Sequence, residues 1–138
     1  MCVPFLRQPV RRLPYGEMCA ALKFEVNKLL SADIARASTS TWVSRVVMVR
    51  EKDSGWRMCV NYRRLNSVTK FDCFSLPSLD NALDAFAGAT VFSSLDLAMA
   101  YHEIPVKPSD VEKTAFITHV GFFEMQKMRF GLCNAPST

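Results

Sequence analysis

Apolar residues recur at helical spacing in one early part of the chain. Between residues 17 and 36 they follow one another mostly at steps of three and four, which predicts an amphipathic helix ending near residues 31–36. The members of this stripe are Met18, Leu22, Val26, Leu29, Leu30 and Ile34. The polar run STST, residues 38–41, then ends the pattern.

A change to strand-like periodicity follows. Residues 42–50 and 56–62 are two strand-like runs, and Asp53, Ser54 and Gly55 between them are typical of a tight hairpin turn. The second run alternates, so two faces are expected. One face carries Trp56, Met58, Val60 and Tyr62, and the other carries Arg57, Cys59, Asn61 and Arg63. The pattern predicts a hairpin with a buried face behind a face that presents two guanidinium groups.

The second half of the chain mixes both periods. Ser78 is expected to cap a short helix that ends at Gly88 and turns its apolar residues, Leu79, Ala82, Leu83 and Phe86, toward the core. We then predict a strand over residues 90–97 with Asp96 on its polar side, a turn or short helix over 98–104, and strands over 114–118 and 122–128 joined by a turn at Val120 and Gly121. Asn134 and Pro136 indicate the start of a further helix. The order of elements predicts an α+β fold, with an antiparallel sheet and packed helices.

Length, composition and charge indicate the size of this fold and the kind of partner it suits. The chain has 138 residues, of which 49% are hydrophobic and 22% charged, as expected of one globular domain. Residues 1–70 hold 13 Lys and Arg against 5 Asp and Glu, whereas residues 71–138 hold 4 against 8. Residues 1–16, with three prolines and three arginines, are expected to form an extended basic arm. A basic half suits contact with phosphates, although two solvated faces of different charge would give the same asymmetry.

Several classes of protein lose support from what the sequence lacks. Five widely spaced cysteines without a C-x-x-C pair disfavour a disulfide framework and a zinc site, and favour a reducing intracellular compartment. No apolar run approaches the roughly 20 residues that span a bilayer, so no membrane partner is expected. The motifs of hydrolases, P-loops and dinucleotide-binding folds are also missing. Taken alone, Asp96 is more typical of a solvated strand-face carboxylate or a local turn former than of a catalyst.

Three long blocks, taken in order, resemble the reverse transcriptase domain of Gypsy-type LTR retrotransposons. They are STSTWVSRVVMVREKDSGWRMCVNYRRLNSVT, FSSLDLAMAYHEIPV and EKTAFITHVGFFEMQKMRFGLCNAPST, and the resemblance covers about residues 11–138. It implies a partial right-hand polymerase fold, with residues 17–90 as fingers and fingers–palm connection and residues 91–138 as an incomplete palm. The implied activity is RNA-directed DNA synthesis on a template with a primer, from deoxynucleoside triphosphates.

The resemblance also assigns roles to single residues. Asp96 is implied as the catalytic carboxylate and a ligand of Mg²⁺ or Mn²⁺, with the backbone carbonyl of Leu97 as a further ligand, because hard cations prefer oxygen. Two such ions would align the primer hydroxyl with the α-phosphate of the nucleotide. Metal binding is thus the expected reason for a carboxylate within this apolar stretch.

Nucleotide and template contacts are implied at seven further positions. Tyr101 matches the aromatic residue that excludes a 2′-hydroxyl, with an ordinary core tyrosine as the alternative. Arg57 and Lys52 match cations that hold the triphosphate, with solvated hairpin charges as the alternative. Phe130 and Gly131 match the segment that packs on base and sugar. Asn61 and Arg63 are expected near the template, or in structural hydrogen bonds.

Departures from the family pattern leave other functions open. Thr41, Arg45, Ser75 and Arg129 stand where proline is common, Asn61 where aspartate is usual, and Glu103 where glutamine is frequent. No adjacent pair of aspartates occurs, so the second metal-binding motif and the later Pol regions (the remaining palm, thumb, RNase H and integrase) are expected to be missing and the chain alone to be inactive. One alternative is a non-catalytic retroelement relic that at most binds nucleic acid. Another is an RNA-dependent RNA polymerase, which Tyr101 disfavours. If expressed, the protein is expected in the cytoplasm, in a virus-like particle.

Overall fold

The protein is described by a computed structural model that covers residues 16–51, 55–72, 79–84 and 86–135, except the side chains of Leu79 and Ala82. Four predicted features lie wholly or mainly outside these residues. They are the basic arm at residues 1–16, the turn residues Asp53 and Ser54, the Ser78 cap and the helix start at Pro136.

The predicted first helix is confirmed as α1, Glu17–Ser31, with Leu22, Val26 and Leu29 buried. Its C-terminus closes with two backbone hydrogen bonds, from Asp33 N to Leu30 O and from Ile34 N to Leu29 O. Asp33 takes a positive φ of 54° between them, so this is a Schellman motif in which aspartate occupies the position usually given to glycine. The motif reverses the chain and leads it directly into β1, Ala35–Ala37.

Five strands form one sheet in the order β1-β5-β4-β2-β3. The predicted hairpin is confirmed as β2, Ser44–Arg50, and β3, Trp56–Asn61, and the two later strands as β4, Phe116–Thr118, and β5, Gly121–Met125. Three of the pairings are antiparallel, but β2 runs parallel to β4, with Ser44 opposite Phe116. The α+β class is therefore confirmed, and the sheet is mixed where the sequence predicts an antiparallel one. It also joins strands from both sides of residue 90.

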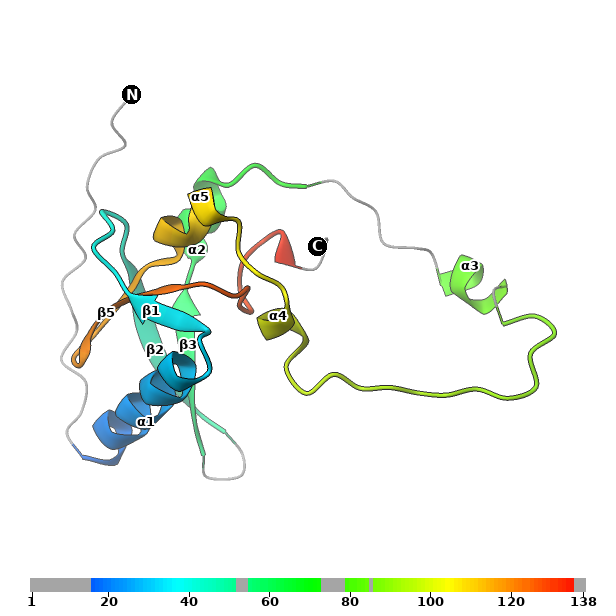
Figure 1. Cartoon of the computed structure of the whole chain (residues 1–138), viewed down its shortest axis with the longest axis horizontal. Helices are drawn as coiled ribbons and strands as arrows, with labels where there is room; N and C mark the ends of the chain where they lie inside the picture. Colours follow the sequence, from blue (N-terminus) through cyan, green and yellow to red (C-terminus); the bar gives the residue numbers. More distant parts are fainter. Residues whose placement is uncertain (1–15, 52–54, 73–78, 85, 136–138) are drawn as a thin grey trace.

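The core lies where α1 contacts β1 and β3 (Figure 1). The predicted apolar face of β3 is confirmed at Met58, Val60 and the following Tyr62, which are buried, while Arg57, Asn61 and Arg63 are exposed. The buried cluster consists of Leu22, Val26, Leu29, Ala35, Met58, Val60, Tyr62, Phe116 and Met125. The Tyr62 hydroxyl donates to the carbonyl of Thr114 at 3.1 Å, so the one phenol in this core is paired.

Shorter helices connect these parts. They are α2, Arg63–Val68; α3, Leu79–Asp84; α4, Ala100–Glu103; α5, Pro108–Val111; and the 3₁₀ turn η1, Glu112–Thr114. The turn or short helix predicted over residues 98–104 is confirmed by α4. Within the described ranges, no helix is both long and apolar enough to cross a membrane.

One part of the molecule extends away from the sheet (Figure 1). We call it the outlying segment: α3 and residues 86–99. The strand predicted over residues 90–97 is wrong, because these residues have no regular secondary structure and every side chain over 91–97 is exposed. No described strand pairs with them, and an isolated strand leaves its backbone hydrogen-bonding groups without partners.

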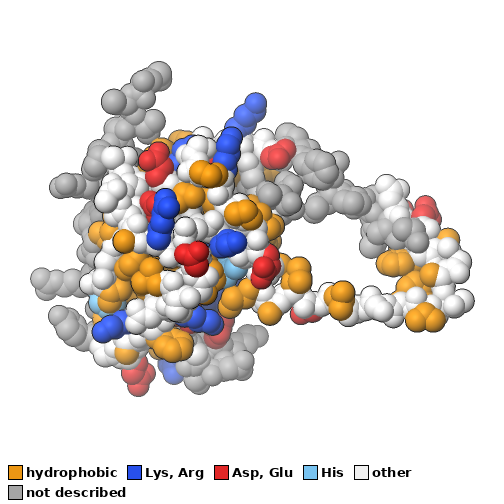
Figure 2. Space-filling view, viewed as in Figure 1, with side chains coloured by type: hydrophobic (Ala, Val, Ile, Leu, Met, Phe, Trp, Pro, Cys, Tyr) orange, Lys and Arg blue, Asp and Glu red, His pale blue; other side chains and the backbone are white. Residues whose placement is uncertain are grey.

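The core-facing helix predicted at this point is also only partly correct. Gly88 has the expected positive φ of 83°, and α3 forms, but Leu83 and Phe86 are exposed. Phe86 and Phe92 pack edge to face with ring centroids 5.4 Å apart. Apolar side chains therefore lie along the whole outlying segment, as Figure 2 shows. The segment therefore has the apolar composition of a buried element, but its described side chains are exposed.

Candidate functional site

A cavity of about 1130 Å³ brings together most of the residues singled out in the sequence. It is lined by residues of α1, of the β2–β3 hairpin, of residues 97–102 and of residues 129–131. The predicted site residues among its lining are Arg57, Asn61, Arg63, Leu97, Tyr101, Phe130 and Gly131. Four segments that are distant in sequence therefore converge on one cavity.

The exposed face of β3 and the start of α2 supply some of the cavity's polar groups. Alternation along the strand puts Arg57 and Asn61 on the side opposite the buried Met58 and Val60, and Arg63 follows at the start of α2. The amide oxygen of Asn61 accepts a hydrogen bond from the backbone N–H of Arg63 at 3.2 Å. Asn61 thus has the structural hydrogen bond that the sequence left open as its alternative role, and this bond stabilises the start of α2.

An aromatic pair forms another wall. The rings of Tyr101, on α4, and Phe130 lie with centroids 6.1 Å apart and planes inclined by 61°. Tyr101 is half-buried, whereas Phe130 is 68% exposed. Gly131 follows with φ of 102°, a conformation that a residue with Cβ adopts only under strain, and its carbonyl accepts from Asn66 Nδ2 at 2.8 Å. Phe130 and Gly131 thus line the cavity next to each other, at a backbone bend that favours glycine.

Asp96 does not join this group. Its neighbour Leu97 lines the cavity but has a 67% exposed side chain, and Asp96 itself is exposed on the outlying segment. Among the described residues, no three His, Cys, Asp or Glu side chains gather closely enough to hold a metal ion. One exposed carboxylate does not meet the ligand number that Mg²⁺ or Ca²⁺ requires, so the described residues alone do not form a divalent-metal site. The role of Lys52 lies outside the described residues.

Sequence reasoning did not assign a site role to five charged residues or histidines that also line the cavity: Glu25, Lys28, Glu51, His102 and Arg129. Burial lowers the pKa of His102, and the cations Arg129 and Lys28 lower it further. Burial also lowers the pKa of the Arg129 guanidinium. Their position next to residues already identified, His102 after Tyr101 and Arg129 before Phe130, was the only signal available in the sequence.

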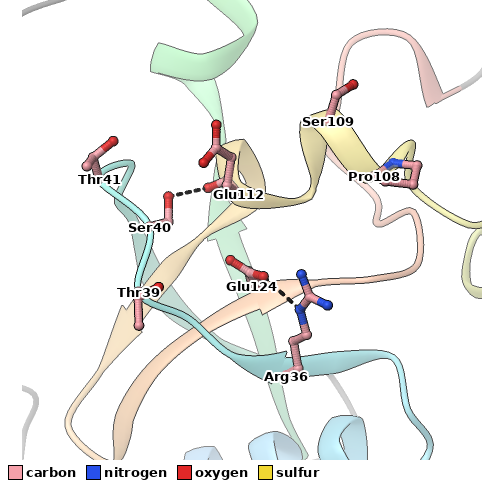
Figure 3. A pocket seen from close by; sticks show the side chains of 8 residues that line it. All are labelled: Arg36, Thr39, Ser40, Thr41, Pro108, Ser109, Glu112 and Glu124. Carbon is pink, nitrogen blue, oxygen red and sulfur yellow. Dashed lines mark hydrogen bonds and ion pairs between the residues drawn. The ribbon is translucent and has the colours of Figure 1, made fainter.

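A second, smaller cavity of about 470 Å³ lies at the other end of β1 and is polar (Figure 3). Arg36 and Glu124 face each other across the β1–β5 pairing, and Arg36 Nε donates to Glu124 Oε1 at 2.8 Å. Ser38 Oγ donates to the other oxygen of the same carboxylate at 2.7 Å. Glu124 is buried, and each of its two carboxylate oxygens accepts a hydrogen bond from a residue of the chain.

The arrangement of these helices and strands recurs in solved protease–reverse transcriptases. The foamy viral protease–reverse transcriptase in complex with dsDNA superimposes with a TM-score of 0.75 at 18% identity, over 99% of this chain and 28% of that one. The native prototype foamy virus protease–reverse transcriptase gives a TM-score of 0.72 at 22% identity, over 94% and 18%. These likenesses show a partial polymerase fold.

Sequence comparison then gives the family. The family model described as reverse transcriptase (RNA-dependent DNA polymerase) matches residues 49–138, and the chain belongs to this family. It is 36% identical over 130 residues to the retrovirus-related Pol polyprotein from transposon opus of Drosophila melanogaster, covering 90% of this chain and 13% of that protein. It is 37% identical over 133 residues to the transposon Tf2-3 polyprotein of Schizosaccharomyces pombe, covering 95% and 10%. The chain thus spans roughly a tenth of the length of these relatives, and is a reverse transcriptase domain fragment related to LTR retrotransposon Pol polyproteins.

Proposed function

We propose that this chain is the fingers and first part of the palm of an RNA-directed DNA polymerase, which extends a primer with deoxynucleoside triphosphates. The observation that carries the proposal is the convergence of Arg57, Tyr101, Phe130 and Gly131 on one cavity. A guanidinium suits a triphosphate, and an aromatic ring next to a bent backbone suits a sugar and a base. A cavity of this size also has room for a nucleotide.

In this proposal the chain supplies only part of the catalytic centre. Asp96 would contribute one oxygen ligand toward a divalent cation, and the other carboxylates would come from protein beyond these 138 residues. A bound cation of this kind stabilises charge on the transferred phosphoryl group. The exposed position of Asp96 agrees with a residue whose partners lie elsewhere.

Template and primer would lie along the basic hairpin. Arg57 and Arg63 are exposed on one face, where they are able to contact phosphates without reading sequence. The foamy viral relative was solved with dsDNA, which supports a nucleic-acid partner for this chain as well.

The decisive experiment is Mg²⁺-dependent primer extension, measured on the chain and, where the reading frame continues past Thr138, on the longer protein. Asp96→Asn is expected to reduce extension about a hundredfold or more, because a few kcal/mol of transition-state stabilisation are lost. Asp110→Asn is the matched control, since this exposed carboxylate lies outside the cavity and pairs with Lys113. Equal activity of the Asp96 variant would reject the metal-ligand role.

Tyr101→Ala tests the sugar contact in the same assay. Removing the ring is expected to raise the incorporation of ribonucleotides relative to deoxyribonucleotides, because space for a 2′-hydroxyl opens. Unchanged discrimination would assign Tyr101 to packing against Phe130.

A non-catalytic relic is the second candidate function, and one observation favours it. Arg45 and Arg129, two positions where the resemblance leads us to expect proline, each have a buried side-chain nitrogen without a hydrogen-bond partner among the described residues. Unpaired buried nitrogens are costly, as expected of substitutions that selection has not removed. A stop codon directly after Thr138 together with absent primer extension would support the relic.

A further inference from the structure

Arg129 differs from the other cations that line the larger cavity. Its Nη2 donates to the carbonyl of Met58 at 2.6 Å, but its Nη1 is buried and has no hydrogen-bond partner among the described residues. The two ion pairs found in the described part of the chain, Arg36 with Glu124 and Lys113 with Asp110, do not involve it. Arg129 is therefore a half-buried positive charge that has one buried, unpaired nitrogen and no ion-pair partner among the described residues.

The surroundings of this charge compensate it only in part. Glu25, half-buried on α1, lies near enough to favour the charged guanidinium, but it forms no ion pair with it among the described residues. Arg57 adds a second positive charge nearby. Because burial removes water from Nη1 and no described group replaces it, the guanidinium keeps hydrogen-bonding capacity for an anion.

The cavity offers a place where an anion would use that hydrogen-bonding capacity. Its lining carries four cationic side chains, Lys28, Arg57, Arg63 and Arg129, against two carboxylates, Glu25 and Glu51. The excess is positive, and low-dielectric walls strengthen the attraction for a negative ligand. Arg45 makes the contrast clear, because its Nε is equally unpaired but it lines neither cavity.

From these observations we propose that Arg129 is an anion-binding residue of the larger cavity and that its ligand is a phosphate group. A planar guanidinium with free N–H donors matches phosphate oxygens in geometry as well as in charge. The phosphate comes either from a nucleoside triphosphate or from a nucleic-acid backbone. The inference builds on the proposed function by adding a phosphate contact, but it concerns binding alone, so a chain that synthesises no DNA still tests it.

The test measures the affinity of the 138-residue chain for phosphate-bearing probes at constant ionic strength, by titration calorimetry and by the rise in melting temperature. The probes are inorganic tripolyphosphate, dTTP, a single-stranded oligonucleotide and, as the probe without phosphate, deoxythymidine. Arg129→Met is expected to bind tripolyphosphate about tenfold more weakly, which corresponds to about 1.4 kcal/mol. It is also expected to melt no lower than the unsubstituted chain without any anion, since it removes a charge that is compensated only in part.

Arg45→Met is the matched control, because it removes the other unpaired buried guanidinium and is expected to leave the affinity for tripolyphosphate unchanged. Arg129→Lys keeps the charge without the planar fork, and an affinity between those of the unsubstituted chain and Arg129→Met would support the proposal. It also replaces Arg129→Met if that variant does not fold.

Stronger binding of dTTP than of the oligonucleotide identifies the nucleotide as the source of the phosphate, and the reverse identifies the backbone. Equal affinity of Arg129→Met and the unsubstituted chain, or no response of the latter to any phosphate-bearing probe, would overturn the proposal.

Discussion

Strand β2 and residues 90–97 of the outlying segment both combine apolar and polar residues in a way that predicts a strand, yet only β2 is one. Strand β2 lies between β3 and β4, so it pairs with β3 over residues 45–50 and with β4 at Ser44 and Arg45. Residues 90–97 have no neighbouring strand in the described chain, and Leu95 is 93% exposed. A strand-like pattern therefore shows only a propensity, and a strand forms where a neighbouring strand is available to pair with it.

The largest expected contrast between the two regions is in their response to losing a phenylalanine. Phe116→Ala removes a side chain that is fully buried in the sheet core, so it is expected to lower the free energy of unfolding by about 3–5 kcal/mol. Phe92→Ala removes a side chain that is 61% exposed on the outlying segment, and a change within about 0.5 kcal/mol is expected. Urea unfolding followed by tryptophan fluorescence measures both. Similar losses in the two variants would mean that the outlying segment packs against the body in solution.

A smaller effect is expected from the two ion pairs, which sharpen the same contrast between buried and exposed positions. Glu124→Gln removes a charge that Arg36 and Ser38 both contact in the sheet, and should cost about 1–2 kcal/mol because Arg36 is itself half in solvent. Asp110→Asn removes the exposed partner of Lys113, with an expected cost below about 0.5 kcal/mol. Thermal unfolding at low and high salt distinguishes them, since screening should weaken the exposed pair more. Equal losses in the free energy of unfolding would contradict the view that burial determines how much each ion pair stabilises the fold.

The smallest effect concerns His102, on α4, where the outlying segment rejoins the body. Because burial and the nearby cations lower its pKa in the folded chain, the unfolded chain binds the proton more readily. The contribution of His102 to the free energy of unfolding is therefore expected to be fully present above about pH 6.5, the pKa of histidine in the unfolded chain. It should fall as the pH drops toward the lower pKa of the folded chain. His102→Gln should flatten this slope while leaving stability above pH 7 nearly unchanged. The slope is read from urea midpoints between pH 7 and 5, and an identical slope in the variant would show that another group causes it.

The sequence predicted most of the elements that pack within the chain, but it missed β1, Ala35–Ala37, because periodicity placed the end of the first helix near residues 31–36. Helix α1 and the strands β2, β3, β4 and β5 all formed where periodicity placed them, because each buries one face against another of the set. The parallel pairing of β2 with β4 was not predictable, since periodicity describes a single strand and says nothing about the direction of its neighbour.

The candidate site was predictable to a similar degree. Resemblance to the family identified Arg57, Tyr101, Phe130 and Gly131, and all four line one cavity, although their roles remain predictions. Arg129 was noted only as a departure from proline, because no one-dimensional pattern reveals that a nitrogen will be buried without a partner. Asp96 was placed at the end of a strand that did not form, because a strand pattern does not show whether a neighbouring strand is available.

The strand order β1-β5-β4-β2-β3 affects when the sheet is able to form during synthesis on the ribosome. Strand β1 at residues 35–37 pairs with β5 at residues 121–125, so the sheet cannot close until residue 125 has left the exit tunnel. Until then α1 and the β2–β3 hairpin can pack only on each other, without Phe116 and Met125, and contacts of such long sequence separation form slowly. Nascent chains of this protein should therefore depend on holding chaperones until residue 125 has emerged.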